Sequence, residues 1–216
     1  MADNRTRSLP IDKSYSYDDY AHVDMSSSCT ALRDIDTSDC HQLHEYLDRC
    51  REDLGAAVLY GGYEEQRSIY DRSDIFSHTT RRRNVHMGLD VWVTSGTSVV
   101  AIADGTIYGH GINHGLGNYG PTIVIKHRCT VRGEFYALYG HLDDIYRGKV
   151  GDAVQVGQHI AHIGTPAVNG DYPPHLHLQI IINMEGNYYD YPGVYTREDV
   201  PKIRKNCPDP MTYLSY

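Results

Sequence analysis

From about residue 84 onward, the sequence is a series of short runs of β-forming residues separated by Gly, Asn, Asp and Pro, and this pattern limits the possible folds more than any other feature. Residues 122–126 alternate in polarity as a half-buried strand does, and no helical periodicity occurs in the same region. The strands that we expect are 85–93, 98–108, 122–127, 134–141, 153–163 and 175–184. Their spacing predicts a mainly β fold, an antiparallel β-sandwich or open barrel, with a small N-terminal helical extension.

One helix is expected ahead of the β-rich region. Apolar residues recur at helical spacing from Leu43 to Leu54, Thr37 or Ser38 can cap the first turn, and Gly55 can end the helix. The apolar stripe is narrow, so we expect this helix to pack onto a larger structure and not to form a core of its own.

Changes in composition divide the 216 residues into four parts. We expect residues 1–35 to form an extended leader, and residues 36–83 to form the helix and a link that pack on the main domain. Residues 84–190 are predicted to be that main domain, and the proline-rich residues 191–216 a loop-rich C-terminal wrap.

Charge and hydropathy exclude several classes of partner. The net charge of −8 and the isoelectric point near 5.8 argue against a nucleic-acid partner, and we interpret the basic run at residues 81–83 as a local feature. No apolar stretch is long enough to span a membrane, and the N-terminus lacks the apolar core of a signal peptide. We therefore expect no membrane partner and a protein that is cytoplasmic or exported by a non-classical route. The oligomeric state is not indicated.

Three histidine-bearing segments, at residues 86–90, 138–142 and 174–177, lie within expected strands. Together they supply His86, Asp90, His141, His175 and His177. Two imidazoles and a carboxylate are enough to hold a zinc ion with one open position for water, and two further imidazoles remain for proton transfer. The spacing alone does not separate the metal ligands from the proton-transfer groups.

The first segment can bind a single ion only if its backbone bends. On a straight strand, His86 and Asp90 point the same way but lie roughly 13 Å apart, which is too far for one zinc ion. Gly88 stands between them, and glycine allows a bulge that brings the two side chains together.

The other two segments can face the same point. His175 and His177 follow two prolines, which argue against a helix, and on a strand they share one face about 6.6 Å apart. One can therefore bind the metal while the other stands beside the bound water. His141 ends a run in which Phe135, Ala137 and Tyr139 point the same way, so we expect it to face this site as well.

The remaining histidines have a simpler interpretation. Five of them are expected to be structural or solvent-facing because no carboxylate accompanies them, namely His110, His114, His127, His159 and His162. Cys40, His41 and His44 could resemble a metal cluster, but a helix surface explains them more simply. The five cysteines show no CxxC spacing, so we expect reduced thiols.

Taken together, these segments resemble the M23 family of zinc metallopeptidases, the lysostaphin-like endopeptidases that cut peptidoglycan cross-links or glycine-rich peptides. The resemblance runs from about residue 84 to residue 184 and includes residues 86–90, 103–107, 139–142, 150–158, 163–164 and 174–177. It implies that His86, Asp90 and His177 bind one Zn²⁺ per chain and that His141 and His175 flank the catalytic water. It also implies hydrolysis of peptide bonds in peptidoglycan stem or cross-link peptides, or in other small-residue-rich peptides.

Three further features qualify the resemblance. Residues 61–70 look like the stretch that precedes M23 domains fused to aminotransferases. Gln179 stands where many relatives carry an acidic residue, and residues 113–119 form an insertion that can reshape the groove. The alternative hypothesis is a catalytically weak M23-like module that acts as a binding or accessory domain of a larger enzyme.

Overall fold

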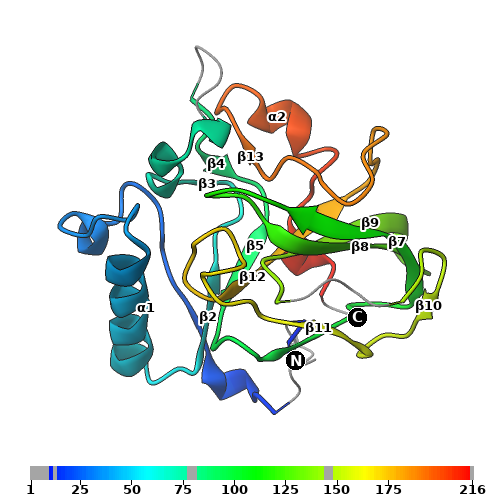
Figure 1. Ribbon diagram of the computed structural model, residues 1–216, viewed down its shortest axis with the longest axis horizontal. Coiled ribbons are helices and arrows are strands. Elements are labelled where there is room, and N and C mark those ends of the chain that lie inside the picture. Colours follow the sequence, from blue (N-terminus) through cyan, green and yellow to red (C-terminus); the bar gives the residue numbers. More distant parts are fainter. Residues whose placement is uncertain (1–9, 12–13, 77–81, 144–147, 215–216) are drawn as a thin grey trace, which may run out of the picture.

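The computed structural model describes residues 10–11, 14–76, 82–143 and 148–214, and its centre is one sheet of eight strands (Figure 1). In spatial order the strands are β1 (Tyr20–His22), β2 (Val58–Gly61), β5 (Leu89–Trp92), β12 (His175–Ile181), β9 (Gly133–Gly140), β8 (Gly120–Cys129), β7 (Gly105–Asn113) and β10 (Ala153–Val154). Neighbours are antiparallel except β1 and β2, which pair in parallel. The predicted mainly β fold is confirmed, with a mixed sheet as its main element.

Two smaller sheets flank the large one. β6 (Ser98–Val100) pairs with β11 (His159–His162), and β4 (Val85–His86) lies between β3 (Glu65–Gln66) and β13 (Val194–Tyr195). Three of the expected strands are therefore wrong as single strands. Residues 85–93, 98–108 and 153–163 each form two strands, and the two halves belong to different sheets. The sequence pattern indicates strand residues but not the sheet that each segment joins, so it does not reveal the change of sheet.

The expected helix is α1 (Cys40–Leu54), and Gly55 ends it with a left-handed φ of 61°. Its N-cap is neither Thr37 nor Ser38 but Asp39, whose carboxylate accepts the backbone N–H groups of His41 and Gln42. The remaining helical segments are short: η1 (Tyr17–Asp19), η2 (Thr30–Leu32), η3 (Ile69–Arg72), η4 (Asp74–Phe76), α2 (Val200–Ile203) and η5 (Pro210–Thr212).

The two faces of the central sheet have different environments. Leu176, Leu178 and Ile180 of β12 are fully buried in the main hydrophobic core, together with residues of β5, β8 and β9. The alternate residues of β12 lie on the opposite face. Beside that face, α1 packs with Leu43 and Leu47 on a second apolar cluster, and Figure 1 shows the helix beside the β2 side of the sheet.

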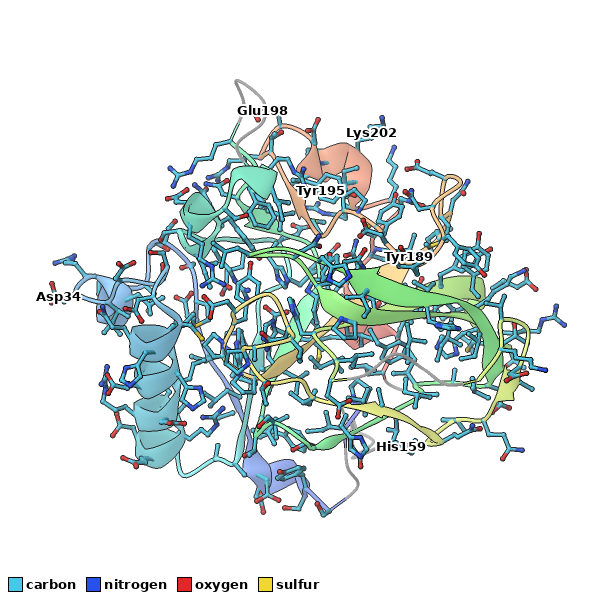
Figure 2. The ribbon with its side chains drawn as sticks, in the orientation of Figure 1. Asp34, His159, Tyr189, Tyr195, Glu198 and Lys202 are labelled. Atoms are coloured by element: carbon cyan, nitrogen blue, oxygen red, sulfur yellow. The ribbon has the colours of Figure 1, made fainter. Side chains whose placement is uncertain are left out.

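Tyr188 and Tyr189 cover β7 at Gly109 and Gly111, where a Cβ atom would collide with them. Tyr189 is labelled in Figure 2. All five cysteines are free, and Cys207 is the buried one. Among the described residues, no helix combines the length and the apolar character needed to cross a membrane.

Candidate metal centre

The register of three neighbouring strands places the metal-site residues in one row. His177 of β12 pairs with Asp90 of β5 on one side and with Gly140 of β9 on the other. Directly opposed residues on one face of a sheet have Cβ atoms about 5 Å apart, so the pairing alone brings Asp90 to His177. His86 approaches from β4 in the neighbouring small sheet.

The β-structure is interrupted at Gly88, and this interruption between two strands brings His86 close to Asp90. The predicted bend is present, but it is not a bulge within one strand, because β4 ends at His86 and β5 begins at Leu89. Glycine is required there for space, because a Cβ at residue 88 would overlap Cε1 of His177. The imidazole of His177 therefore packs directly against the backbone of the break.

His141 reaches the site by a route that the sequence argument did not identify. Phe135, Ala137 and Tyr139 face the main core, away from the face that carries His177, so simple alternation would bury His141 there. That part of the prediction was wrong. His141 follows the end of β9 with a φ of 63°, and this left-handed conformation turns its ring to the opposite face. Its ring centroid lies 4.2 Å from that of His175 and 6.2 Å from that of His177.

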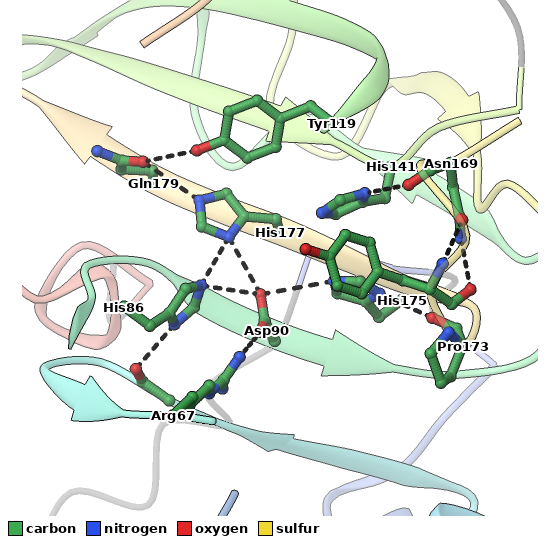
Figure 3. A network of polar contacts seen from close by, with 12 residues as sticks. Arg67, His86, Asp90, Tyr119, His141, Asn169, Pro173, His175, His177 and Gln179 are labelled. Atoms are coloured by element: carbon green, nitrogen blue, oxygen red, sulfur yellow. Dashed lines mark hydrogen bonds and ion pairs between the residues drawn. The ribbon is translucent and has the colours of Figure 1, made fainter. Parts of the chain in front are cut away.

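The hydrogen bonds of the two candidate ligand imidazoles assign their tautomers. His86 Nδ1 lies 2.8 Å from the carbonyl oxygen of Gly62, and His177 Nε2 lies 3.2 Å from Oε1 of Gln179 (Figure 3). Each of these nitrogens must therefore carry the proton and donate it. The other nitrogen of each ring, Nε2 of His86 and Nδ1 of His177, then presents a lone pair.

These lone pairs converge with a carboxylate on one point. His86 Nε2 and His177 Nδ1 are 2.8 Å apart, and Asp90 Oδ1 is 3.3 Å from the first and 3.1 Å from the second. With both donor protons used elsewhere, all three atoms are acceptors, and a bound cation would relieve the repulsion among them. Ligands held about 2.0–2.1 Å from a tetrahedral ion lie about 3.3 Å apart. The three residues therefore fit a single divalent metal, and among the described residues they are the one such group.

The carboxylate of Asp90 is held ionised. Burial by itself would raise its pKa, but the positive charge beside it, which Arg67 supplies permanently, keeps the pKa well below its usual range. Arg67 Nη1 donates to Asp90 Oδ2 at 2.5 Å, and Arg67 Nε donates to Glu65 Oε2 at 2.5 Å. Asp90 Oδ1 therefore stays free to face the two imidazoles, while the second oxygen is fixed by the ion pair.

The two remaining imidazoles each present one basic nitrogen. Nδ1 of His175 lies 2.8 Å from the Pro173 carbonyl oxygen, and Nδ1 of His141 lies 2.7 Å from that of Asn169, so both Nδ1 atoms donate (Figure 3). Burial lowers the pKa of His175 to about 4, and burial also holds the pKa of His141 well below its usual range. Both rings are therefore neutral at neutral pH, with Nε2 available to accept a proton.

All five predicted site residues are buried and come together at this centre, and His86, Asp90 and His177 form a metal site. The assignment of proton-transfer roles to His141 and His175 stays a prediction. The structure adds residues that the sequence argument missed. Arg67 orients Asp90 from within the segment 61–70, and Asn169 orients His141 from a loop that has no distinguishing sequence pattern.

Two residues noted as departures from the family also belong to the site. Gln179 Oε1 accepts a hydrogen bond from Nε2 of His177, and the Gln179 amide nitrogen donates to the Pro192 carbonyl at 3.0 Å and to Cys207 Sγ at 3.3 Å. Tyr119, from the insertion at 113–119, places its ring 5.0 Å from that of His177. The histidines set aside as structural lie outside this group, and His127 is buried against the hydroxyl of Tyr139.

A buried His₂Asp site, with two neutral imidazoles beside its open side, belongs to the class of metal-dependent hydrolases. Comparison with known proteins gives the family. Residues 84–190 match the model of peptidase family M23. The chain is 30% identical over 138 residues, 64% of its length, to an uncharacterized metalloprotease of Buchnera aphidicola, covering 33% of that protein. It is 36% identical to lysostaphin of Staphylococcus staphylolyticus over 105 residues, 48% of this chain and 20% of lysostaphin. Residues 84–190 of the chain therefore form a metallopeptidase domain of the M23 family.

The extent of these matches is limited. The chain spans between 19% and 33% of the length of the curated relatives. Among solved structures, the catalytic domain of lysostaphin from Staphylococcus simulans is 26% identical, with a TM-score of 0.46, and the alignment covers 73% of this chain and 92% of that domain.

Proposed function

We propose that the protein is a zinc-dependent endopeptidase in which His86, Asp90 and His177 hold the metal while His141 and His175 handle the proton. The convergence of three lone pairs at 2.8–3.3 Å, with their donor protons engaged elsewhere, is the observation that carries this proposal. Two nitrogens and one carboxylate oxygen in a closed, tetrahedral-sized arrangement favour zinc among the common divalent metals.

The chain's own residues account for the proton transfer. Zinc, when bound, acidifies a water molecule and polarises the substrate carbonyl. Nε2 of either His141 or His175 can accept the proton of that water, because the backbone carbonyls of Asn169 and Pro173 hold Nδ1 as the donor in both rings. The protonated imidazole can then donate to the leaving amine, which completes the transfer.

The substrate that we propose is a peptide of the peptidoglycan stem or cross-link type, or another small-residue-rich peptide. The likeness to lysostaphin over 105 residues supports this class. The further resemblance of residues 61–70 to M23 proteins fused to aminotransferases stays a prediction.

The test separates the two kinds of residue. His177→Ala should abolish stoichiometric zinc binding and turnover, whereas His141→Ala should keep one zinc per chain and lower turnover about 10²- to 10⁴-fold. Zinc content is measured by elemental mass spectrometry. Turnover is measured with purified muropeptides and with a pentaglycine peptide, first on the untreated protein, then after chelation, and again after zinc is added back.

Unchanged turnover in both variants would refute the mechanism. Binding of muropeptides without any cleavage by the zinc-loaded protein would instead support the alternative of a binding or accessory module.

A further inference from the structure

The metal centre opens into a single cavity of about 250 Å³ that continues past the metal ligands toward α1. Its near end is formed by residues of the metal site, including Asp90 and His177. Its far end is formed by Met25, Thr37 and Leu43, which precede the family-matched segment by more than 40 residues. The N-terminal part of the chain is thus a wall of the active-site cavity as well as a support for the sheet.

Most of the cavity wall is apolar and aromatic, and Arg67, Arg83 and Asp190 add charged groups to it. The apolar part includes the buried side chains of Ile69, Tyr70, Phe76, Trp92 and Tyr172. These residues belong to the second apolar cluster, in which α1 also packs. Surfaces of this composition gain free energy by covering apolar groups and lose it by covering charged or polar ones.

The volume of the cavity sets the size of its occupant. A cavity of roughly 150 Å³ lined by apolar side chains is enough to hold a benzene ring. The cavity beside the metal site, at about 250 Å³, exceeds that size while still reaching the metal ligands. It therefore has room for one large side chain next to a peptide bond that lies at the metal.

We propose that this cavity is a specificity subsite, built in part by residues 25–76, that binds one large apolar or aromatic side chain of the substrate residue flanking the scissile bond. The proposal rests on the proposed peptidase function and refines its substrate. Within small-residue-rich peptides, the preferred cleavage point is next to a residue such as Phe or Leu.

The first experiment compares three quenched fluorescent peptides with the zinc-loaded protein: pentaglycine, Gly-Gly-Phe-Gly-Gly and Gly-Gly-Leu-Gly-Gly. We expect kcat/KM for the Phe and Leu peptides to exceed that for pentaglycine at least tenfold, as burial of one such side chain allows. Mass spectrometry of the products should place the cut at a bond that flanks Phe or Leu.

Two variants are designed to fill the cavity, and the residues that they change are neither metal ligands nor hydrogen-bond partners of the ligands. Ile75→Trp and Thr37→Phe enlarge half-buried lining residues from η4 and from the turn before α1. Each should reduce the ratio of kcat/KM for the Phe peptide to kcat/KM for pentaglycine at least fivefold. Leu54→Trp, at the exposed C-terminal end of α1 and outside the cavity, is the matched control and should keep the preference. Thermal unfolding checks that each variant folds. If one of the two filled variants does not fold, the other variant alone provides the test.

Equal kcat/KM for all three peptides, or a Phe preference that both filled variants retain, would overturn the subsite. Failure to cleave any peptide would contradict the proposed function instead. In that case titration calorimetry with N-acetyl-phenylalanine amide and N-acetyl-glycine amide still tests the cavity, because only the first should bind to the wild type and neither to the filled variants. Weak binding of both amides, equal in wild type and variants, counts against the subsite.

Discussion

Gly88 shows how a single missing side chain can determine a metal site. The sequence predicts that glycine is needed there for a bend, and the bend is present. The close contact behind it could not be predicted, because the neighbour is the ring of His177, 89 positions further along the chain. The candidate ligands could be predicted from the sequence because the residue type alone determines whether a side chain can bind a metal. The orientation of His141 was not, because it depends on one left-handed φ.

A methyl group at residue 88 should therefore weaken metal binding. The added Cβ would lie 2.6 Å from Nε2 of His177, so the ring must shift and lose its alignment with Gln179 and the metal. We expect Gly88→Ala to lower zinc affinity about 10- to 100-fold, measured by competition with a chromophoric chelator. Gly133→Ala is the control. Gly133 has a left-handed φ of 73°, which disfavours alanine, but a Cβ added there would meet no neighbouring atom. It should reduce stability and leave zinc affinity unchanged.

At the scale of elements, the sequence indicates the type of each segment better than its ends. Composition and alternation identify the β-rich region, but the breaks within 85–93, 98–108 and 153–163 depend on which sheet each half joins. The N-terminus of α1 is a similar case. Ser38, Thr37 and Asp39 are all residue types that can cap a helix. The choice depends on the turn before the helix, where the Ser38 hydroxyl donates to Asp36 and leaves the capping position to Asp39.

One pair of variants can test whether Asp39 or Ser38 caps α1. Asp39→Ala removes the acceptor for two backbone N–H groups at the start of α1 and should lower the free energy of unfolding by about 1 kcal/mol. Ser38→Ala removes a hydroxyl that bonds only within an exposed turn and should change it by less than about 0.5 kcal/mol. Urea unfolding at pH 7 compares the two, and a larger loss for Ser38→Ala would restore the capping position predicted from the sequence.

At the scale of the whole molecule, Arg72 joins the segment before residue 84 to the loop at residues 169–172, which lies beside the metal site. Arg72 donates to the backbone carbonyl oxygens of Ser38 at 3.1 Å, of Gly170 at 3.1 Å and of Asp171 at 2.5 Å. Its guanidinium also lies 4.3 Å from the ring centre of Tyr172. The loop that it holds contains Asn169, whose carbonyl oxygen fixes the tautomer of His141. A sequence with no distinguishing pattern at these positions could not have linked them.

Loss of this contact should therefore affect proton transfer more than metal binding. We expect Arg72→Ala to lower kcat about tenfold with zinc content unchanged, because a small displacement of a proton-transfer group is costly. Arg72→Lys keeps the charge without the forked donors and should recover only part of the loss. Arg82→Ala is the control, because Arg82 pairs with Asp71 on an exposed surface and such pairs contribute little. Steady-state kinetics on one peptide, with hydrogen exchange at residues 169–172, measures both effects. If kcat falls while those amides remain as protected as in the wild type, then the loop does not carry the effect and Arg72 acts by another route.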